Sequence, residues 1–593
     1  MYSFEEEENV AEKIYIGVAW PYASGSRTLG HVAGFGVPSD VFARYHRLVG
    51  NDVLMVSGTD DHGTPTTIRA EREGKSPQEL SDYYNHEIAD NLAQLGIAYD
   101  LFTRTATRNH YPVVQDIFLR HLERGTIFSD KMVGTYCEHC GRFLPDRYVE
   151  GTCPHCGYTE ARGDQCDACG RQLDPSDLVQ PRCKLCGHPP VFRETEHFFL
   201  NLPAFDGRLR QYLQGKESYW RPNVINFTYG LLNEGLKPRP ITRDIEWGVP
   251  IPLPGYESKR IYVWFDAVIG YLSGSKEWAM LTGDTERWRE WWQNRESRHY
   301  YFMGKDNIVF HSVIWPSILM GYDESLQLPY EIVSSEFLTM EGKRFSTSRG
   351  IAVWLPDYLS RYEPDPLRYY LMINGPETRD TDFSWAEFVR RNNDELVATW
   401  GNLAHRVLSM TQRYFQGVVP QPGTLDARDG EILARAEKAF AIVGDLLARC
   451  KFKAAIQEVM ALAQEANRYL DACAPWKTVK QDAIRTATTL FVALRLVDSL
   501  KTLFCPFTPH TAQVLHQMLG YPATISGEIH FEEVDEEGKR HRVYRWHPGK
   551  WEGRWAPSEL QAGRRLGRPQ PLFRKLDESI VEEEVARMEQ QAG

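Results

Sequence analysis

The stretch PYASGSRTLGH, residues 21–31, lies between an apolar run and a helix-like pattern, and this arrangement decides the fold of the N-terminal region. The apolar runs at 13–20 and 52–57 are short enough to be buried parallel strands. Between them, residues 30–50 carry apolar side chains at helical spacing, and a second helix is predicted over 76–95. Because strands alternate with helices, the sequence predicts a parallel α/β sheet in which residues 21–31 form a strand-to-helix loop.

The rest of the chain divides into regions of different pattern. Residues 130–200 are rich in Cys, Gly, Pro and Asp, which indicates an insertion organised by metal. Patterns of strand followed by helix resume at 260–271 and 299–321. Residues 385–520 are helical almost throughout and predict an all-α domain, and a hairpin is predicted over 529–545.

The composition is that of an ordinary globular protein, with 42% hydrophobic and 25% charged residues in a chain of 593, long enough for several domains. No stretch approaches the roughly 18–20 apolar residues of a membrane span, and the acidic N-terminus is unlike a secretory leader. We therefore expect a cytoplasmic protein. The net charge of −12 argues against a general nucleic-acid coat but permits binding at a local basic face.

Eight of the eleven cysteines form four Cys-x-x-Cys pairs, each followed by glycine and separated by 12, 9 and 13 residues. The eight are Cys137, Cys140, Cys153, Cys156, Cys166, Cys169, Cys183 and Cys186. Two such pairs complete a tetrahedral thiolate site, so the spacing predicts two structural zinc ions, with pairs joined either consecutively or in nested order. An iron–sulfur cluster is the less favoured alternative, and disulfides do not suit a cytoplasmic protein.

Two loops are candidates for binding phosphate. Residues 21–31 would present backbone N–H groups at a helix start, although they match neither the GxGxxG nor the GxxxxGK[ST] pattern. The second loop, MEGKRFSTSRG at 340–350, is basic, rich in hydroxyls and bounded by glycine, which suits the clamping of a polyphosphate. Taken singly, the first equally fits an ordinary turn and the second a solvated basic loop.

Together the two loops resemble the paired signatures of class I aminoacyl-tRNA synthetases. Thr28-Leu-Gly-His31 stands at the HIGH motif, and Arg344-Phe-Ser-Thr-Ser348 stands at the KMSKS motif. The surrounding sequence resembles the methionyl-tRNA synthetase family over residues 13–578. The matching stretches are AWPYASGS, DDHGTP, GTCPHCG, YVWFDAVIGY, GKDNIVFH, DTDFSWAEFVRRNNDELVATWGNLAHR, APW and PQPLFRKLDE.

The resemblance implies a Rossmann-like parallel-sheet catalytic domain with a zinc-binding insertion, followed by an all-α anticodon-binding bundle. It also implies domain boundaries. The catalytic domain would occupy 1–125 and 259–333, the zinc insertion 126–258, a stem-contact region 334–389, the anticodon-binding domain 390–545 and a C-terminal tail 546–593.

In this family, methionine and ATP, which carries Mg²⁺, form methionyl-adenylate, and the methionyl group is then passed to the 3′-terminal adenosine of its tRNA. The resemblance implies catalytic roles for Thr28, His31, Lys343, Arg344, Ser346 and Thr347. It implies nucleotide contacts at Gly30, His31, Gly304, Asp306 and Thr347, and a methionine pocket of Ala19, Trp20, Tyr22, Asp60, Trp264, Ala267, Tyr271 and His311. The CAU anticodon would be read by Asn402, Arg406 and Trp476. For zinc, it implies nested sites, an inner one of Cys153, Cys156, Cys166 and Cys169 and an outer one of Cys137, Cys140, Cys183 and Cys186.

Three positions depart from the family pattern. Thr28 replaces the first histidine of HIGH, Thr347 replaces the second lysine of KMSKS, and Val268 replaces a proline of the amino-acid pocket. Two kinds of alternative to a methionine–tRNA ligase stay open. One is another class I synthetase, or a paralogue that makes an adenylate for another acceptor, and the other is a tRNA-binding protein without catalysis. We further expect a monomer, because no appended tRNA-binding or dimerisation domain is recognisable.

Overall fold

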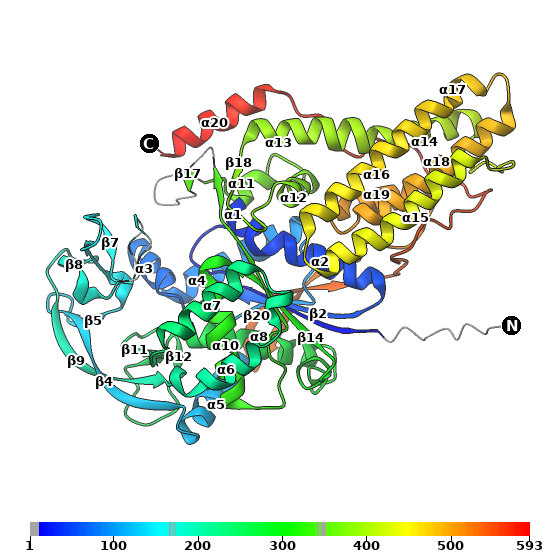
Figure 1. Ribbon diagram of the computed structural model, residues 1–593. Coiled ribbons are helices and arrows are strands. Elements are labelled where there is room, and N and C mark those ends of the chain that lie inside the picture. Colours follow the sequence, from blue (N-terminus) through cyan, green and yellow to red (C-terminus); the bar gives the residue numbers. More distant parts are fainter. Residues whose placement is uncertain are drawn as a thin grey trace.

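The computed structural model describes residues 11–164, 166, 168–169, 171, 173–340, 343–344 and 352–592. Its catalytic part is built around a sheet of seven described strands in the order β15-β14-β1-β2-β3-β20-β19 (Figure 1). The strands are β1 (Lys13–Val18), β2 (Asp52–Thr59), β3 (Leu101–Arg104), β14 (Arg298–Gly304), β15 (Glu331–Ser335), β19 (Glu528–Glu536) and β20 (Lys539–His547). Strands β15, β14, β1, β2 and β3 are mutually parallel, as the sequence predicts.

The central strand β1 is buried on both faces. Ile14, Ile16 and Val18 belong to one hydrophobic core, whereas Tyr15 belongs to the other, so alternate side chains enter different cores. A parallel sheet covered on both sides needs such a continuous apolar run. The polar residues of the following loop therefore begin where the strand leaves the core, at the carboxyl edge of the sheet.

The predicted N-terminal helices are confirmed. The loop after β1 enters α1 (Leu29–His31), a π-helical segment (Val32–Gly36) and α2 (Val37–Val49). Gly50 ends α2 in the left-handed conformation, with φ of 97°, which favours glycine. The second predicted helix is α4 (Pro77–Gln94), which Ser76 caps by accepting a hydrogen bond from the backbone N–H of Glu79.

The cysteine-rich insertion is a separate β structure at the left of Figure 1. A long antiparallel pair, β4 (Ile127–Cys137) and β9 (Val191–Leu200), connects it to the sheet domain. Its outer part is a small sheet in the order β7-β6-β8, made of β6 (Val149–Thr152), β7 (Ala161–Arg162) and β8 (Val179–Cys183). The cysteine pairs lie in turns at the ends of these strands.

The predicted strand followed by a helix at 260–271 is present, but most of the stretch is helical. The strand β13 is only Arg260–Ile261, and α8 (Val263–Leu281) begins immediately afterwards. The boundary between strand and helix is hard to place from sequence because α8 is buried on nearly all sides, and such a helix has no polar face to reveal its period. Trp264, Ala267 and Tyr271 therefore project from a helix.

The predicted all-α domain is confirmed and forms the bundle at the upper right of Figure 1. Its elements are α13 (Trp385–Arg391), a π-helical segment (Asn392–Gly401), α14 (Asn402–Phe415), α15 (Ala427–Ala448), α16 (Phe452–Cys473), α17 (Pro475–Thr478), α18 (Ala483–Phe504) and α19 (Pro509–Met518). In the part of the chain that the structure describes, no helix is both long enough and apolar enough to cross a membrane.

The predicted hairpin is present as β19 and β20, but it does not pack within the helical bundle. It extends the catalytic sheet, because Tyr544 of β20 pairs antiparallel with Phe102 of β3 and their rings stack 5.2 Å apart. The hairpin thus covers the edge of β3, which would otherwise expose unpaired backbone groups. Helix α20 (Ser579–Ala592) then returns to the body, where Glu584 forms an ion pair with Arg361.

A buried ion cluster joins the helical bundle to the catalytic sheet domain. Asp40 of α2 pairs with Arg44 at 2.7 Å and with Arg368 of α12 (Pro364–Ile373) at 2.5 Å. Arg368 also donates to the carbonyl oxygens of Pro506 and Phe507, which follow α18. Burial by itself would raise the pKa of Asp40, but the two guanidinium groups hold that pKa below its usual value.

We expect Arg368→Met to lower the free energy of unfolding by about 3–5 kcal/mol, because it leaves Asp40 only partly compensated in the core. Chemical denaturation measures this loss. Arg449→Met is the matched control, since Arg449 pairs with Asp445 at the surface, where such a pair contributes roughly 0–1 kcal/mol. Equal losses in the two variants would contradict the assigned importance of the buried cluster.

Candidate active site

The first of the two loops singled out in the sequence is hydrogen-bonded to residues 353–355, which follow the second loop. The backbone N–H of Leu29 donates to the carbonyl of Val353 at 3.0 Å, and the N–H of Leu355 donates to the carbonyl of Arg27 at 2.7 Å. Two backbone hydrogen bonds therefore join the segment that follows the basic loop to the first loop. Lys343 and Arg344 form the short strand β17 beside β16 (Leu338–Met340). The side chains of Lys343 and Arg344, and the whole of Ser346 and Thr347, lie outside what the structure describes.

His31 is held by the residue that departs from the family pattern. The backbone N–H of Thr28 donates to Nδ1 of His31 at 3.1 Å, and the Thr28 hydroxyl lies 2.8 Å from the same nitrogen. Burial, and secondarily the charge of Arg27, lower the pKa of His31 to about 3. The ring is therefore neutral near pH 7. Because Nδ1 accepts hydrogen bonds, its proton is on Nε2, which is left to donate to a ligand.

Gly304 lies beside this loop. It ends β14, the strand that pairs with β1, and the N–H of Ala19 donates to the carbonyl of Phe302 at 2.9 Å. A Cβ placed on Gly304 would meet nothing within 4 Å, so the backbone is open to a ligand at this point. Asp306 follows in the next turn, Lys305–Asn307.

Asp60 is a buried carboxyl group whose pKa differs strongly from its usual value. It lies beside Tyr22 in a parallel bridge, and its side chain accepts a hydrogen bond from the N–H of His62 at 3.2 Å. Burial raises the pKa of Asp60 well above its usual value, and the neighbouring Asp266 and Asp61 raise it further. No side-chain cation in the described part of the chain forms an ion pair with it. A ligand carrying an ammonium group would supply the missing positive charge.

Three of the residues predicted for the methionine pocket lie on α8, the helix that also carries Asp266. Trp264, Ala267 and Tyr271 lie three and four positions apart along α8, so they share a face of the helix. The hydroxyl of Tyr271 lies 2.8 Å from Nε2 of His311, whose Nδ1 lies 2.8 Å from the carbonyl of Asn307. Burial lowers the pKa of His311 to about 4, so this histidine is neutral near pH 7. The ring of Trp20 lies 6.4 Å from that of Tyr271.

Val268, the third departure from the family pattern, is buried beside Ala267 on α8 and belongs to the hydrophobic core. Its side chain therefore contributes packing at this point.

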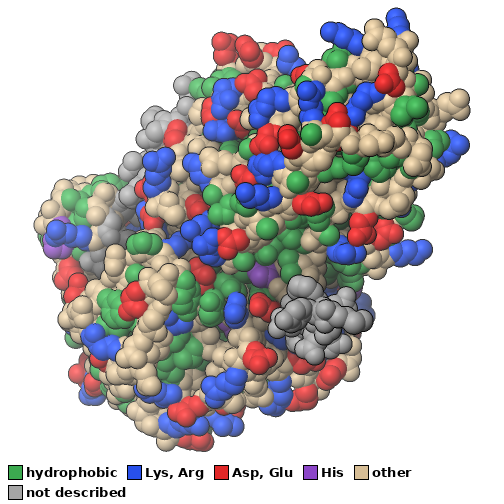
Figure 2. Space-filling view, turned by 45° about the vertical axis from the view of Figure 1, so that its right-hand side comes forward, with side chains coloured by type: hydrophobic (Ala, Val, Ile, Leu, Met, Phe, Trp, Pro, Cys, Tyr) green, Lys and Arg blue, Asp and Glu red, His purple; other side chains and the backbone are tan. Residues whose placement is uncertain are grey.

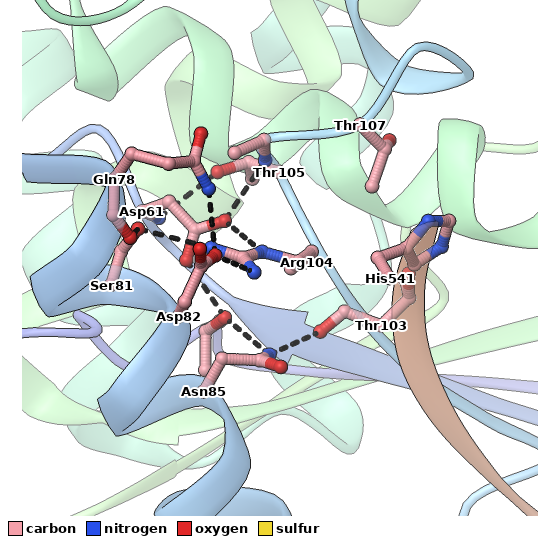
Figure 3. Close-up of polar contacts among 12 residues, drawn as sticks. Asp61, Gln78, Ser81, Asp82, Asn85, Thr103, Arg104, Thr105, Thr107 and His541 are labelled. Carbon is pink, nitrogen blue, oxygen red and sulfur yellow. Dashed lines mark hydrogen bonds and ion pairs between the residues drawn. The ribbon is translucent and has the colours of Figure 1, made fainter. Parts of the chain in front are cut away.

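Sequence reasoning missed a buried polar network behind this pocket. Asp266 of α8 accepts from His62 at 2.6 Å and from His110 of α5 (His110–Glu123), and these histidines hold the pKa of Asp266 well below its usual value despite burial. Asp61 accepts from Nε of Arg104 at 2.8 Å, and Arg104 also pairs with Asp82 of α4 (Figure 3). The signal was present, because DDHGTP contains two further ionisable residues and Asp266 interrupts an apolar helix.

The three residues predicted to read an anticodon gather at the far end of the bundle. Asn402 and Arg406 are one turn apart on α14, and Arg406 lies over the ring of Trp476 with 5.2 Å to its centroid. Arg406 also forms an ion pair with Asp471 at 2.9 Å. The Trp476 side chain is 36% exposed, so a face of this tryptophan is available for stacking.

The cysteines form two clusters in the nested order that the resemblance implied. The outer cluster brings Cys137 within 3.5 Å of Cys186 and Cys140 within 3.9 Å of Cys183, measured between sulfur atoms. The inner cluster brings Cys156 within 3.5 Å of Cys166 and Cys153 within 3.9 Å of Cys169. These separations fit four thiolates around one tetrahedral ion, for which adjacent sulfurs lie about 3.8 Å apart when each metal–sulfur bond is about 2.3 Å.

Comparisons with known proteins agree with this geometry. The family "tRNA synthetases class I (M)" matches residues 14–408, and "Anticodon binding domain of methionyl tRNA ligase" matches residues 419–529. The chain is 58% identical to methionine–tRNA ligase of Chloroflexus aggregans, across 98% of this chain and 100% of that protein. Identity to the ligase of Thermomicrobium roseum is 57%, across 97% and 99%. The fold matches Mycobacterium tuberculosis methionyl-tRNA synthetase bound by methionyl-adenylate, with a TM-score of 0.74, 24% identity, and coverage of 95% of this chain and 100% of that one.

We expect the purified chain to hold two metal ions. Cys153→Ser should remove the inner ion and Cys137→Ser the outer ion, because each site needs four thiolates, and either change should halve the metal content measured by mass spectrometry. Cys473→Ser is the control, since Cys473 lies outside both clusters, and it should retain two ions. Loss of both ions in either single variant would contradict two independent sites.

Proposed function

We propose, because this chain belongs to the methionyl-tRNA synthetase family of class I enzymes, that it is a methionine–tRNA ligase. It activates L-methionine with ATP to methionyl-adenylate and then transfers the methionyl group to the 3′-terminal adenosine of tRNA(Met). The observation that carries this proposal is the backbone hydrogen bonding between residues 27–29 and residues 353–355, together with the buried Asp60 carboxylate, which has no side-chain cation as a partner among the described residues. Residues 21–31 and 353–355 would border the nucleotide, and Asp60 would bind the amino acid.

In the first step, a carboxylate oxygen of methionine attacks the α-phosphorus of ATP, and the bond between that phosphorus and the bridging oxygen to the β-phosphorus breaks, releasing diphosphate. Mg²⁺ bound with ATP would neutralise part of the phosphate charge. His31 donates from Nε2 to a phosphate oxygen, and Thr28 orients the ring by binding Nδ1. Lys343, Arg344, Ser346 and Thr347 would close over the departing diphosphate, and Gly304 and Asp306 would hold the nucleoside. Catalysis is then mainly positioning and electrostatic stabilisation.

For the amino acid, Asp60 binds the ammonium group in its ionised form. Its raised pKa in the free protein falls when the ammonium binds, since an adjacent cation favours the carboxylate. Trp20, Trp264, Tyr271 and His311 enclose the thioether side chain, together with Ala19, Tyr22 and Ala267. A polarisable sulfur is favoured in contact with aromatic rings.

For the tRNA, Trp476 stacks on an unpaired anticodon base while Asn402 and Arg406 read base edges. Lys and Arg are interspersed with Asp and Glu on the face of the molecule shown in Figure 2, so recognition would rest on local contacts of this kind.

Zinc would occupy both cysteine clusters and have a structural role, because all four ligands of each site come from the protein. The thiolate ligands suit the reducing conditions of a cytoplasmic enzyme. We further propose that the enzyme acts as a monomer, which light scattering tests.

Methionine-dependent exchange of labelled diphosphate into ATP, followed by charging of tRNA(Met), tests the function. Absence of exchange would exclude a ligase and leave a tRNA-binding protein, whereas exchange without charging would indicate an adenylate made for another acceptor. Both activities together support the proposed ligase.

We expect Asp60→Asn to raise KM for methionine by about 10- to 100-fold in the exchange reaction, because a charged hydrogen bond contributes roughly 1.5–3 kcal/mol. KM for ATP should change little. The control is Asp52→Asn, which removes an exposed carboxylate at the start of β2. An unchanged KM for methionine in the Asp60 variant would exclude Asp60 as the ammonium ligand.

We expect Thr28→Val to lower kcat of exchange about three- to tenfold, because valine keeps the shape of threonine but loses the bond to His31, worth about 1 kcal/mol. Thr28→Ser keeps the hydroxyl and should retain most of the rate. Similar rates for the two variants would show that the hydroxyl does not orient His31. Thr28→His should also reduce the rate, because Thr28 is 2% exposed and a larger side chain at a buried position displaces its neighbours.

A further inference from the structure

The tip of the C-terminal hairpin reaches the back of the proposed methionine site. It lies outside both family matches, which end at residues 408 and 529. Glu537 and Gly538 form the turn, with φ of 54° and 90°. The tip, residues 535–541, lies against residues 105–109, which connect β3 to α5 and which we call the β3–α5 connection.

Glu536 binds this connection through two backbone groups. One carboxylate oxygen accepts from the N–H of Asn109 at 2.8 Å, and the other accepts from the N–H of Arg108 at 2.9 Å. These groups precede α5, where a negative charge is favoured by the helix dipole. Lys539 adds a third contact, because its ammonium group donates to the carbonyl of Ala106 at 3.2 Å.

The opposite side of the β3–α5 connection binds Asp61, the neighbour of Asp60. The N–H of Asp61 donates to the hydroxyl of Thr105 at 3.0 Å, and the N–H of Ala106 donates to the carboxylate of Asp61 at 2.9 Å. The connection also leads into His110, which binds Asp266. Ala106 therefore contacts the hairpin through its carbonyl oxygen. Through its N–H it contacts the loop that carries Asp60 and Asp61, which we call the acidic loop.

His541 provides the positive charge at the centre of this contact. Its Nε2 lies 2.6 Å from Glu277 of α8, and its Nδ1 lies 3.5 Å from Glu536. Glu277 is 1% exposed and also accepts from the hydroxyl of Thr103 at 2.9 Å. Figure 3 shows His541 on the hairpin strand, beside Thr103 and Thr107. Although burial opposes it, the two carboxylates raise the pKa of His541 to about 9, so the imidazolium form is present near pH 7.

We infer that residues 535–541 position the acidic loop of the methionine site, with Glu536 and His541 as the positioning residues. The inference rests on the proposed function, since it concerns the same amino-acid site. His541 joins the hairpin to α8, which carries Trp264 and Tyr271, and Glu536 fixes the connection that holds Asp61. Without these contacts, Asp60 would shift relative to Trp264 and Tyr271. Methionine binding would then weaken more than nucleotide binding.

The test compares His541→Gln and Glu536→Gln with two controls on the same hairpin, His530→Gln and Glu533→Gln. His530 and Glu533 are exposed, and among the described residues neither forms a hydrogen bond or an ion pair with the β3–α5 connection or with α8. We expect each tip variant to raise KM for methionine about tenfold in diphosphate exchange, as displacement of a site from a distance does. KM for ATP should stay within about twofold, and the controls should resemble the unmodified chain.

If the hairpin tip stabilised the fold without positioning the methionine site, the tip variants would give a different result. Their unfolding temperature would fall while their KM for methionine stayed equal to that of the controls, and this result would overturn the inference. Should His541→Gln fail to fold, the KM for methionine of Glu536→Gln, divided by that of Glu533→Gln, tests the inference in its place. The double variant Glu277→Gln/His541→Gln removes both charges and should recover part of the methionine affinity. Absence of exchange in the unmodified chain would instead refute the proposed ligase, so the two failures are distinguishable.

Discussion

The contact between Asp40, Arg44 and Arg368 is the interaction on which the arrangement of the whole molecule depends. A carboxylate with no exposed surface is stable in the core only when cations and N–H groups surround it. Here those groups come from α2, from α12 and from the N–H of Ala98. Because Arg368 also binds carbonyl groups at the end of α18, the same charge balance ties the helical bundle to the sheet. The helical bundle that carries Trp476 and the loop that carries His31 are thereby held in a fixed arrangement.

Charge balance also organises the site itself. Asp61 is compensated by Arg104, and Asp266 is compensated by two histidines, whereas Asp60 is buried between these acids and paired with no described side-chain cation. This difference makes Asp60 the one member of the group suited to an external ammonium ion. Neutral histidines complement it, since His31 and His311 both have lowered pKa values and act as oriented hydrogen-bonding groups.

Much of this was predictable from the sequence. The strand at 13–18, the helices at 37–49 and 77–94, the helical bundle and the hairpin all follow from local pattern. At 260–271 the point where the strand ends and the helix begins was not predictable, because a helix buried on nearly all sides has no polar face to distinguish it from a buried strand. Among the site residues, His31, Asp60 and Trp476 lie where their proposed roles require, but those roles remain predictions. Lys343, Arg344, Ser346 and Thr347 remain predictions from the motif alone.

By itself, the sequence determined the secondary-structure elements, the cysteine pairs and the family, since each of these depends on residues close together in the chain or on matching motifs. Only the tertiary structure decided how close the sulfur atoms of the nested cysteine pairs lie, which acids have a partner, and where the C-terminal hairpin packs. The physical reason is that these properties depend on distance in space. Cys137 is brought to Cys186, His541 to Glu277 and Arg104 to Asp61 by folding, and no local pattern encodes those distances.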